Sequence, residues 1–95
     1  KGHTLCVPKK EINKIFDMEK ELYTRLMEFS YDVAKAIEKA VPCKRVGVAV
    51  VGLEVPHVHV HLIPLQDMDD MRFQRKASLT QQEFEETAQQ IAANL

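Results

Sequence analysis

The sequence is poor in residues that mark several protein classes. It has no tryptophan, only two cysteines and three glycines, and aromatic residues make up 6% of its 95 positions. Cys6 and Cys43 lie far apart and match no CxxC spacing. They therefore predict neither a disulfide framework nor a zinc knuckle. A reducing, cytoplasmic setting is the expectation that follows.

The charge balance and the hydrophobic pattern argue against a nucleic-acid-coating protein and against a membrane protein. Thirteen Lys and Arg against 14 Asp and Glu give a net charge of −1, without the basic excess expected of a nucleic-acid-coating or membrane-surface protein. No apolar run approaches the roughly 20 residues of a membrane span, and no signal-peptide pattern opens the chain. Hydrophobic residues still make up 45% of the sequence, enough for the core of one domain over residues 1–95.

The beginning of the chain is unusual for a complete gene product. It reads KGHTLCVPKK, without an initiator Met, and enters a strand-like stretch almost at once. We therefore expect a single domain that lacks its N-terminal segment.

Two segments have helical patterns. After Asp17, a plausible N-cap, apolar residues recur every three or four positions until Pro42, namely Leu22, Leu26, Phe29, Val33 and Ile37. Near the C-terminus, Thr80 and Glu83 have the spacing of a capping box. A second apolar stripe follows it, formed by Phe84, Ala88, Ile91 and Leu95. A long helix and a C-terminal helix are predicted.

Three short segments have strand character: residues 2–7, 45–52 and 57–63. Pro8 ends the first and Pro64 is expected to end the third, and the polar residues 65–77 are expected to form a loop. Strands adjacent in sequence with helices before and after them predict an α+β domain. Its antiparallel sheet would be covered on one face by the long helix.

The chain has four histidines, and three of them alternate with valines in PHVHVH, at positions 56–61. In a strand, every second side chain points to the same face, so His57, His59 and His61 would form a row with a spacing of about 6.6 Å. Val58, Val60 and Leu62 would point to the other face.

Such a row suits chemistry at phosphorus. A tetrahedral phosphate fits between the outer rings with its phosphorus over His59. A neutral imidazole is a nucleophile available near pH 7, and a backbone carbonyl that accepts from Nδ1 would leave the Nε2 lone pair exposed. The nucleophile would form a P–N bond that water later breaks, while the outer imidazoles bind phosphoryl oxygens and the leaving group.

Three alternatives remain open. HxH on a strand is a common ligand pair for zinc or copper, although three facial ligands usually come from more than one strand. The row could also be a solvated polar face, which the concentration of three histidines in five positions argues against. Finally, it could bind a ligand without turnover.

The stretch GLEVPHVHVHLIP resembles the signature of the histidine triad (HIT) superfamily, in which three histidines alternate with apolar residues and two apolar residues follow. Residues 57–63 match this pattern throughout. GHTLCVPKK is similar to the upstream strand of the family, where a histidine precedes LVIPK. The resemblance runs from Gly2 to about Pro64 and includes all four histidines.

The resemblance implies a bacterial, phosphoramidase-like nucleotide hydrolase or transferase that acts at an α-phosphate, with no cofactor or essential metal. The expected substrates are nucleoside phosphoramidates, dinucleoside polyphosphates and related nucleoside monophosphate esters. His59 would be nucleotidylated and oriented by the carbonyl of His57, His61 would contact the phosphate or leaving group, and His3 would support the site. A homodimer with a continuous antiparallel sheet is also implied, and neither a nucleic-acid polymer nor a membrane is an expected partner.

Three positions depart from the family pattern. Leu53 and Glu54 stand where Gln followed by Ser or Thr is common. Glu54 is either an acid that serves the leaving group or, more simply, a loop residue. Val46 stands where the phosphoramidase branch often has Asn. These departures keep open a second hypothesis, a nucleotide-binding regulatory module with weak turnover, and the third remains a metal-binding protein.

Overall fold

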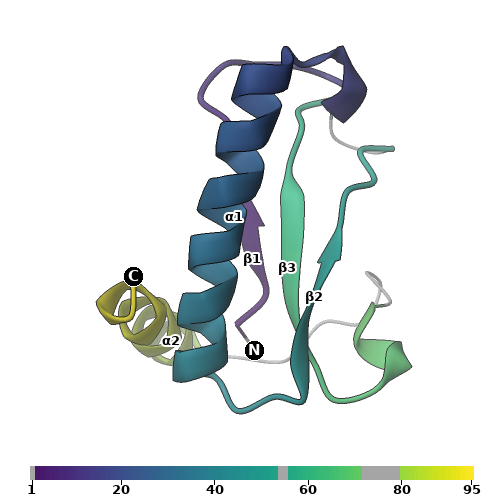
Figure 1. Ribbon diagram of the computed structural model, residues 1–95. Coiled ribbons are helices and arrows are strands. Elements are labelled where there is room, and N and C mark those ends of the chain that lie inside the picture. Colours follow the sequence, from purple (N-terminus) through teal and green to yellow (C-terminus); the bar gives the residue numbers. More distant parts are fainter. Residues whose placement is uncertain (1, 54–55, 72–79) are drawn as a thin grey trace.

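The computed structural model of the protein describes residues 2–53, 56–71 and 80–95 (Figure 1). Three strands form one sheet; the long helix lies between the first and second strands in the chain, and the second helix follows the third strand. The elements in chain order are β1 (Thr4–Cys6), the 3-10 helix η1 (Ile15–Asp17), α1 (Lys20–Ala40), β2 (Arg45–Ala49), β3 (Val60–Leu65), the 3-10 helix η2 (Met68–Met71) and α2 (Gln81–Ala93).

The sheet has the order β1-β3-β2, and the central strand β3 is antiparallel to both neighbours. Leu62 of β3 lies opposite Thr4 and Val48, and the next position back, His61, lies opposite Leu5 and Ala49. The long helix α1 covers one face of this sheet, and α2 packs against α1 (Figure 1). The predicted α+β architecture is confirmed.

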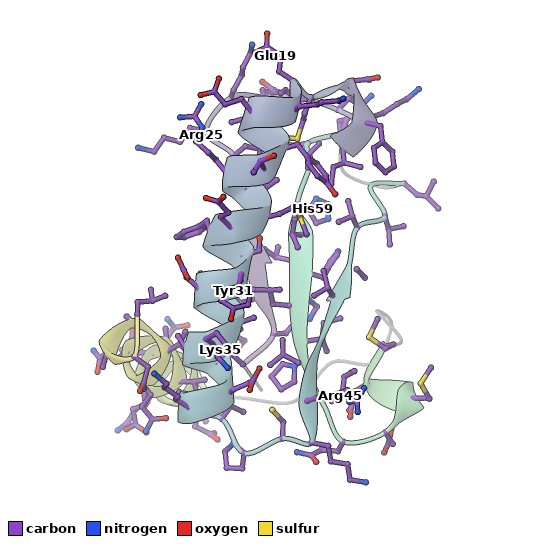
Figure 2. The ribbon with its side chains drawn as sticks, viewed as in Figure 1. Glu19, Arg25, Tyr31, Lys35, Arg45 and His59 are labelled. Carbon is purple, nitrogen blue, oxygen red and sulfur yellow. The ribbon has the colours of Figure 1, made fainter. Side chains whose placement is uncertain are left out.

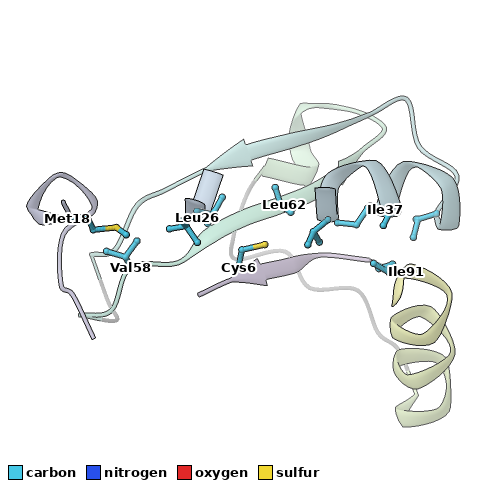
Figure 3. Close-up of a cluster of buried hydrophobic side chains, with 11 residues drawn as sticks. Cys6, Met18, Leu26, Ile37, Val58, Leu62 and Ile91 are labelled. Atoms are coloured by element: carbon cyan, nitrogen blue, oxygen red, sulfur yellow. The ribbon is translucent and has the colours of Figure 1, made fainter. Parts of the chain in front are cut away.

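The core lies between α1 and the sheet (Figure 3). Ile37 on the helix and Val60 and Leu62 on the strand are fully buried. Burial of each such aliphatic side chain contributes about 1.5–3 kcal/mol, so this layer fixes β3 under the helix. The complete cluster is Cys6, Met18, Leu26, Val33, Ala36, Ile37, Val41, Val58, Val60, Leu62 and Ile91.

The inward face of α1 differs from the predicted stripe at one position. Leu26, Val33 and Ile37 are buried as expected, but Phe29 is 53% exposed and Ser30 takes the inward place. Ser30 donates to the Leu26 carbonyl at 2.8 Å, which satisfies its buried hydroxyl. Both positions neighbour Leu26 on a helix, so hydrophobicity alone selected the wrong one.

The start of α1 was also predicted too early. The helix begins at Lys20 with Glu19 as its N-cap, and Asp17 ends the preceding 3-10 turn. Glu21 and Arg25, one turn apart on the exposed side, form an ion pair at 4.0 Å.

The strands are shorter than predicted, and β3 is displaced along the chain. It begins at Val60 rather than at His57, because the N–H of Val58 donates to the Ile12 carbonyl at 2.8 Å instead of to a neighbouring strand. Pro64 lies inside β3 and does not end it. Because β1 pairs with β3 only as far as Leu62, β3 has a partner on one side only at Pro64, where a missing N–H is tolerated.

The C-terminal helix begins with the predicted capping box of Thr80 and Glu83. Its predicted apolar stripe is wrong, since Phe84, Ala88 and Leu95 are exposed and only Ile91 of that set is buried. The predicted loop after β3 contains η2, and residues 72–79 lie outside the described part of the chain. In the described ranges, no helix has the length and apolar character to cross a membrane.

Candidate active site

The four histidines come from two places in the chain that the sheet brings together. His61 lies in β3 and points away from α1, because its neighbours Val60 and Leu62 are buried under the helix. His3 directly precedes β1, which pairs with β3. His57 and His59 lie where the chain approaches β3, and Figure 2 shows His59 at the entry to that strand.

His59 is held by the backbone of its own segment. Its Nδ1 lies 2.7 Å from the carbonyl oxygen of His57. A carbonyl can only accept, so Nδ1 carries the hydrogen and the neutral ring has its lone pair on Nε2. Nε2 has no hydrogen-bond partner among the residues that the structure describes. The hydrogen bond expected between these residues is present, and it leaves the outer nitrogen able to act as a nucleophile or acceptor.

The side chain of His57 also holds this segment in place. Its Nε2 donates to the Pro8 carbonyl at 3.1 Å, and the N–H of Val58 donates to the Ile12 carbonyl. These two contacts hold the backbone at 57–58, and with it the carbonyl that orients His59. The sequence did not reveal the roles of Pro8 and Ile12, because a residue of any type can supply a backbone carbonyl as an acceptor.

His3 and His61 share one hydrogen bond between ring nitrogens. The distance from Nε2 of His3 to Nδ1 of His61 is 2.9 Å, so one of these nitrogens carries a hydrogen and the other accepts it. Burial lowers the pKa of both rings, and the nearby His59 and His3 rings lower the pKa of His61 further. Protonation of either ring to its cationic form is therefore disfavoured.

The rings do not form the predicted regular row. His59 and His61 have ring centroids 4.8 Å apart at 70°, and His3 and His61 have centroids 5.1 Å apart at 50°. The ring of His57 is instead bonded to the Pro8 carbonyl. Because β3 begins only at Val60, strand geometry does not set the spacing of the first two histidines. The structure thus brings His3, His59 and His61 into one ring cluster.

The other candidate residues from the sequence are Glu54, Leu53 and Val46. Glu54 lies outside the described residues, and the side chain of Leu53 is 90% exposed. Val46 pairs with Pro64 and packs against the core, so it lies on the α1 side of the sheet, opposite His61. Val46 is therefore a partly buried residue that packs against the core and is not a member of the histidine cluster.

The ring nitrogens are also informative about metal binding. Nδ1 of His59 and Nε2 of His57 are engaged with backbone carbonyls, and Nδ1 of His61 with His3. Within residues 2–53, 56–71 and 80–95, no group of three or more His, Cys, Asp or Glu side chains is arranged to hold an ion. The described residues therefore provide no ligand set for the alternative function, a metal site.

A pocket of about 290 Å³ opens beside His59. Its walls come from two segments, the turn that includes η1 and the chain that follows β2. Gly52 in the second segment has φ +75°, a conformation that residues with a Cβ rarely adopt. The lining residues are Asn13, Lys14, Ile15, Phe16, Asp17, Val50, Val51, Gly52, Val58 and His59.

The histidine cluster and the sheet beneath it agree with the family suggested by the sequence. Residues 1–68 match the HIT domain family model. The chain belongs to the HIT domain family. It is 27% identical to an uncharacterized HIT-like protein of Borreliella burgdorferi, over 99% of this chain and 74% of that protein.

Two further comparisons bear on function and fold. The chain is 30% identical to the asymmetrical bis(5'-nucleosyl)-tetraphosphatase of Schizosaccharomyces pombe, over 72% of this chain but 40% of that enzyme. The crystal structure of a histidine triad protein from Sinorhizobium meliloti superposes with a TM-score of 0.83 at 22% identity, covering 96% of this chain and 73% of that one. Family membership and the enzyme relative support nucleotide hydrolase activity in general, and the fold is that of HIT proteins.

Proposed function

We propose that the protein is a nucleotidyl hydrolase or transferase that acts at the α-phosphate of nucleoside phosphoramidates or dinucleoside polyphosphates through a covalent nucleotidyl-His59. The observation that carries the proposal is the 2.7 Å hydrogen bond from Nδ1 of His59 to the His57 carbonyl. It fixes the tautomer that has a lone pair on Nε2, and such a lone pair is what an attack on phosphorus requires.

In the first step, Nε2 of His59 attacks the α-phosphorus in line. A P–N bond forms while the bond from phosphorus to the leaving group breaks, and the leaving group departs with the electron pair. In the second step, water attacks the same phosphorus, the P–N bond breaks and the nucleoside monophosphate is released. No metal or other cofactor is needed to balance either step.

His61 is the group best placed to assist, since its ring centroid lies 4.8 Å from that of His59. It donates a hydrogen bond to a phosphoryl oxygen or to the leaving group, where charge develops in the transition state. The lowered pKa of His61 favours its neutral ring, which donates through its N–H. His3 holds the ring of His61 through their shared hydrogen bond.

The proposal is tested with adenosine 5'-phosphoramidate, assayed with and without a chelator, beside a His59→Ala variant and a Lys35→Gln control on the exposed side of α1. Turnover that resists the chelator and is lost only in His59→Ala supports it. A trapped intermediate should be labile in acid and stable in base, as P–N bonds are. The opposite lability contradicts a histidine nucleophile.

Two other results would point to the alternative functions. Binding of adenosine monophosphate without turnover of any nucleotide indicates a regulatory module. Activity abolished by the chelator, or one tightly held metal ion per chain, indicates a metal-binding protein.

The same proposal includes a homodimer in the cytoplasm. In the described sheet, β1 and β2 are both edge strands, and Phe29 and Tyr31 on α1 are exposed at 53% and 66%. Unpaired strand edges and exposed aromatic side chains are features that a second subunit covers. The free thiols of Cys6 and Cys43 suit a reducing compartment. Light scattering after size exclusion should give the mass of two chains.

A further inference from the structure

The pocket beside His59 adjoins the histidine cluster through that one residue. Of the four histidines, only His59 lines it, whereas His3 and His61 lie together on the open face of the sheet. At about 290 Å³, it is at the lower limit of pockets that hold small ligands. Such a volume suits a part of a nucleotide substrate rather than the whole of it. A group attached to a phosphorus at His59 can therefore extend into it.

One cationic side chain, that of Lys14, lines the pocket. Lys14 and Asp17 both line it, three residues apart, and their backbones are joined by a hydrogen bond from Asp17 N to Lys14 O. Their side chains form no ion pair among the described residues. The amide of Asn13 adds a second polar group that can donate hydrogen bonds. The ammonium group of Lys14 is therefore available to an anionic group of a ligand.

The remaining walls are apolar and open to solvent on one side. Phe16 is 88% exposed and Val51 is 50% exposed, so the pocket is not closed at its rim. An anionic chain can enter between these walls while its charge stays partly hydrated. A neutral amine leaving group, by contrast, gains nothing from the ammonium group of Lys14.

We propose that this pocket receives the group that leaves the α-phosphorus, and that Lys14 makes the site prefer phosphate or short polyphosphate leaving groups over neutral amines. The inference rests on the proposed function, because it assigns the side of His59 on which the leaving group lies. For a dinucleoside tetraphosphate, the P–N bond to His59 forms, the P–O bond breaks, and a nucleoside triphosphate departs with the electron pair. Lys14 offsets the negative charge on that departing chain, and Asp17 opposes it.

The test compares two substrates that share an adenosine 5'-phosphoryl group and differ in what leaves. These are diadenosine tetraphosphate, which releases ATP, and adenosine 5'-phosphoramidate, which releases ammonia. In Lys14→Gln, the ratio of kcat/KM for the first substrate over the second should fall by about two- to fivefold, the usual range for an exposed charge interaction. In Asp17→Asn the ratio should rise, and in Lys35→Gln, whose position Figure 2 shows near the C-terminal end of α1, it should not change.

A second measurement does not depend on turnover. Inorganic tripolyphosphate should bind to the wild-type protein in a calorimetric titration, and Lys14→Gln should weaken its binding about fivefold, with a smaller difference at high salt.

The outcomes separate the two proposals. If the wild-type protein turns over both substrates but Lys14→Gln leaves their ratio unchanged, the proposed function stands and the role of Lys14 is wrong. An equal loss for both substrates overturns it too, since the pocket would then hold the shared adenosine. If neither substrate is turned over, the proposed function fails, and this inference fails with it.

Discussion

The Nδ1 atom of His59 lies 2.7 Å from the backbone oxygen of His57, two residues earlier in the chain. The candidate nucleophile is thus oriented by a main-chain group, and no carboxylate side chain is needed to fix its tautomer. The ring of His57 contributes indirectly, because its bond to the Pro8 carbonyl holds the segment that carries this oxygen.

This relationship predicts unequal effects at the two positions. His59→Ala removes the nucleophile and should lower kcat for adenosine 5'-phosphoramidate about 1,000-fold or more. His57→Ala keeps the backbone carbonyl and loses only its anchor, so kcat should fall about tenfold. The check is steady-state kinetics with circular dichroism on both variants. An equal loss in two well-folded variants would mean that the side chain of His57 takes part in the reaction.

The hydrogen bond between His3 and His61 predicts non-additive kinetics. Each single change to Gln breaks the same 2.9 Å contact. His61→Gln should lower kcat/KM about 100-fold and His3→Gln about tenfold. The double variant should be no slower than His61→Gln, because His3 acts through His61. A double variant with the product of both losses would indicate that His3 acts on the substrate independently.

Stability should fall as the pH is lowered through the range in which histidine takes up protons. Burial holds the pKa of His3 and His61 below the ordinary value of 6.5, so the unfolded chain binds protons that the folded one resists. Their contribution is fully present above pH 6.5 and is lost as the pH falls toward the folded pKa values. Urea midpoints should therefore decrease between pH 7.5 and pH 5.5.

The matched control for this prediction is the double variant His3→Gln, His61→Gln. Its urea midpoint should depend less on pH over the same range, because the two groups responsible are absent. An identical decrease in both proteins would assign the effect to other residues.

Two substitutions on α1 test the observed core against the predicted stripe. Ile37 is fully buried, and Ile37→Ala should lower the free energy of unfolding by about 2–5 kcal/mol. Phe29 is 53% exposed, and Phe29→Ala should change it by less than about 1 kcal/mol in the monomer. Urea denaturation of dilute protein measures both. A loss at Phe29 that grows with protein concentration would locate this ring in a subunit interface.

The alternation of histidine and valine shows which structural features the local sequence alone predicts. Val58, Val60 and Leu62 are buried as the pattern predicts, because apolar side chains at every second position need a common covered face. The capping box of Thr80 and Glu83 was also predicted correctly, because its two partners are three residues apart and need no contact with a distant part of the chain.

Other features depended on contacts between distant parts of the chain. Strand β3 begins after His59 because the Ile12 carbonyl takes the N–H of Val58, and nothing near position 58 encodes that partner. Ser30 rather than Phe29 faces inward because the sheet approaches α1 along a line that helical spacing alone cannot select.

The sequence by itself determined the α+β class and the alternation of His57, His59 and His61 with apolar residues, since both depend on residue type and short spacing. Only the tertiary structure decided that His3 bonds His61 across 58 positions, that Val46 packs against the core, and that Lys14 lines a pocket with His59. The physical reason is that backbone acceptors and pocket walls come from segments that meet only when the sheet and helix pack together.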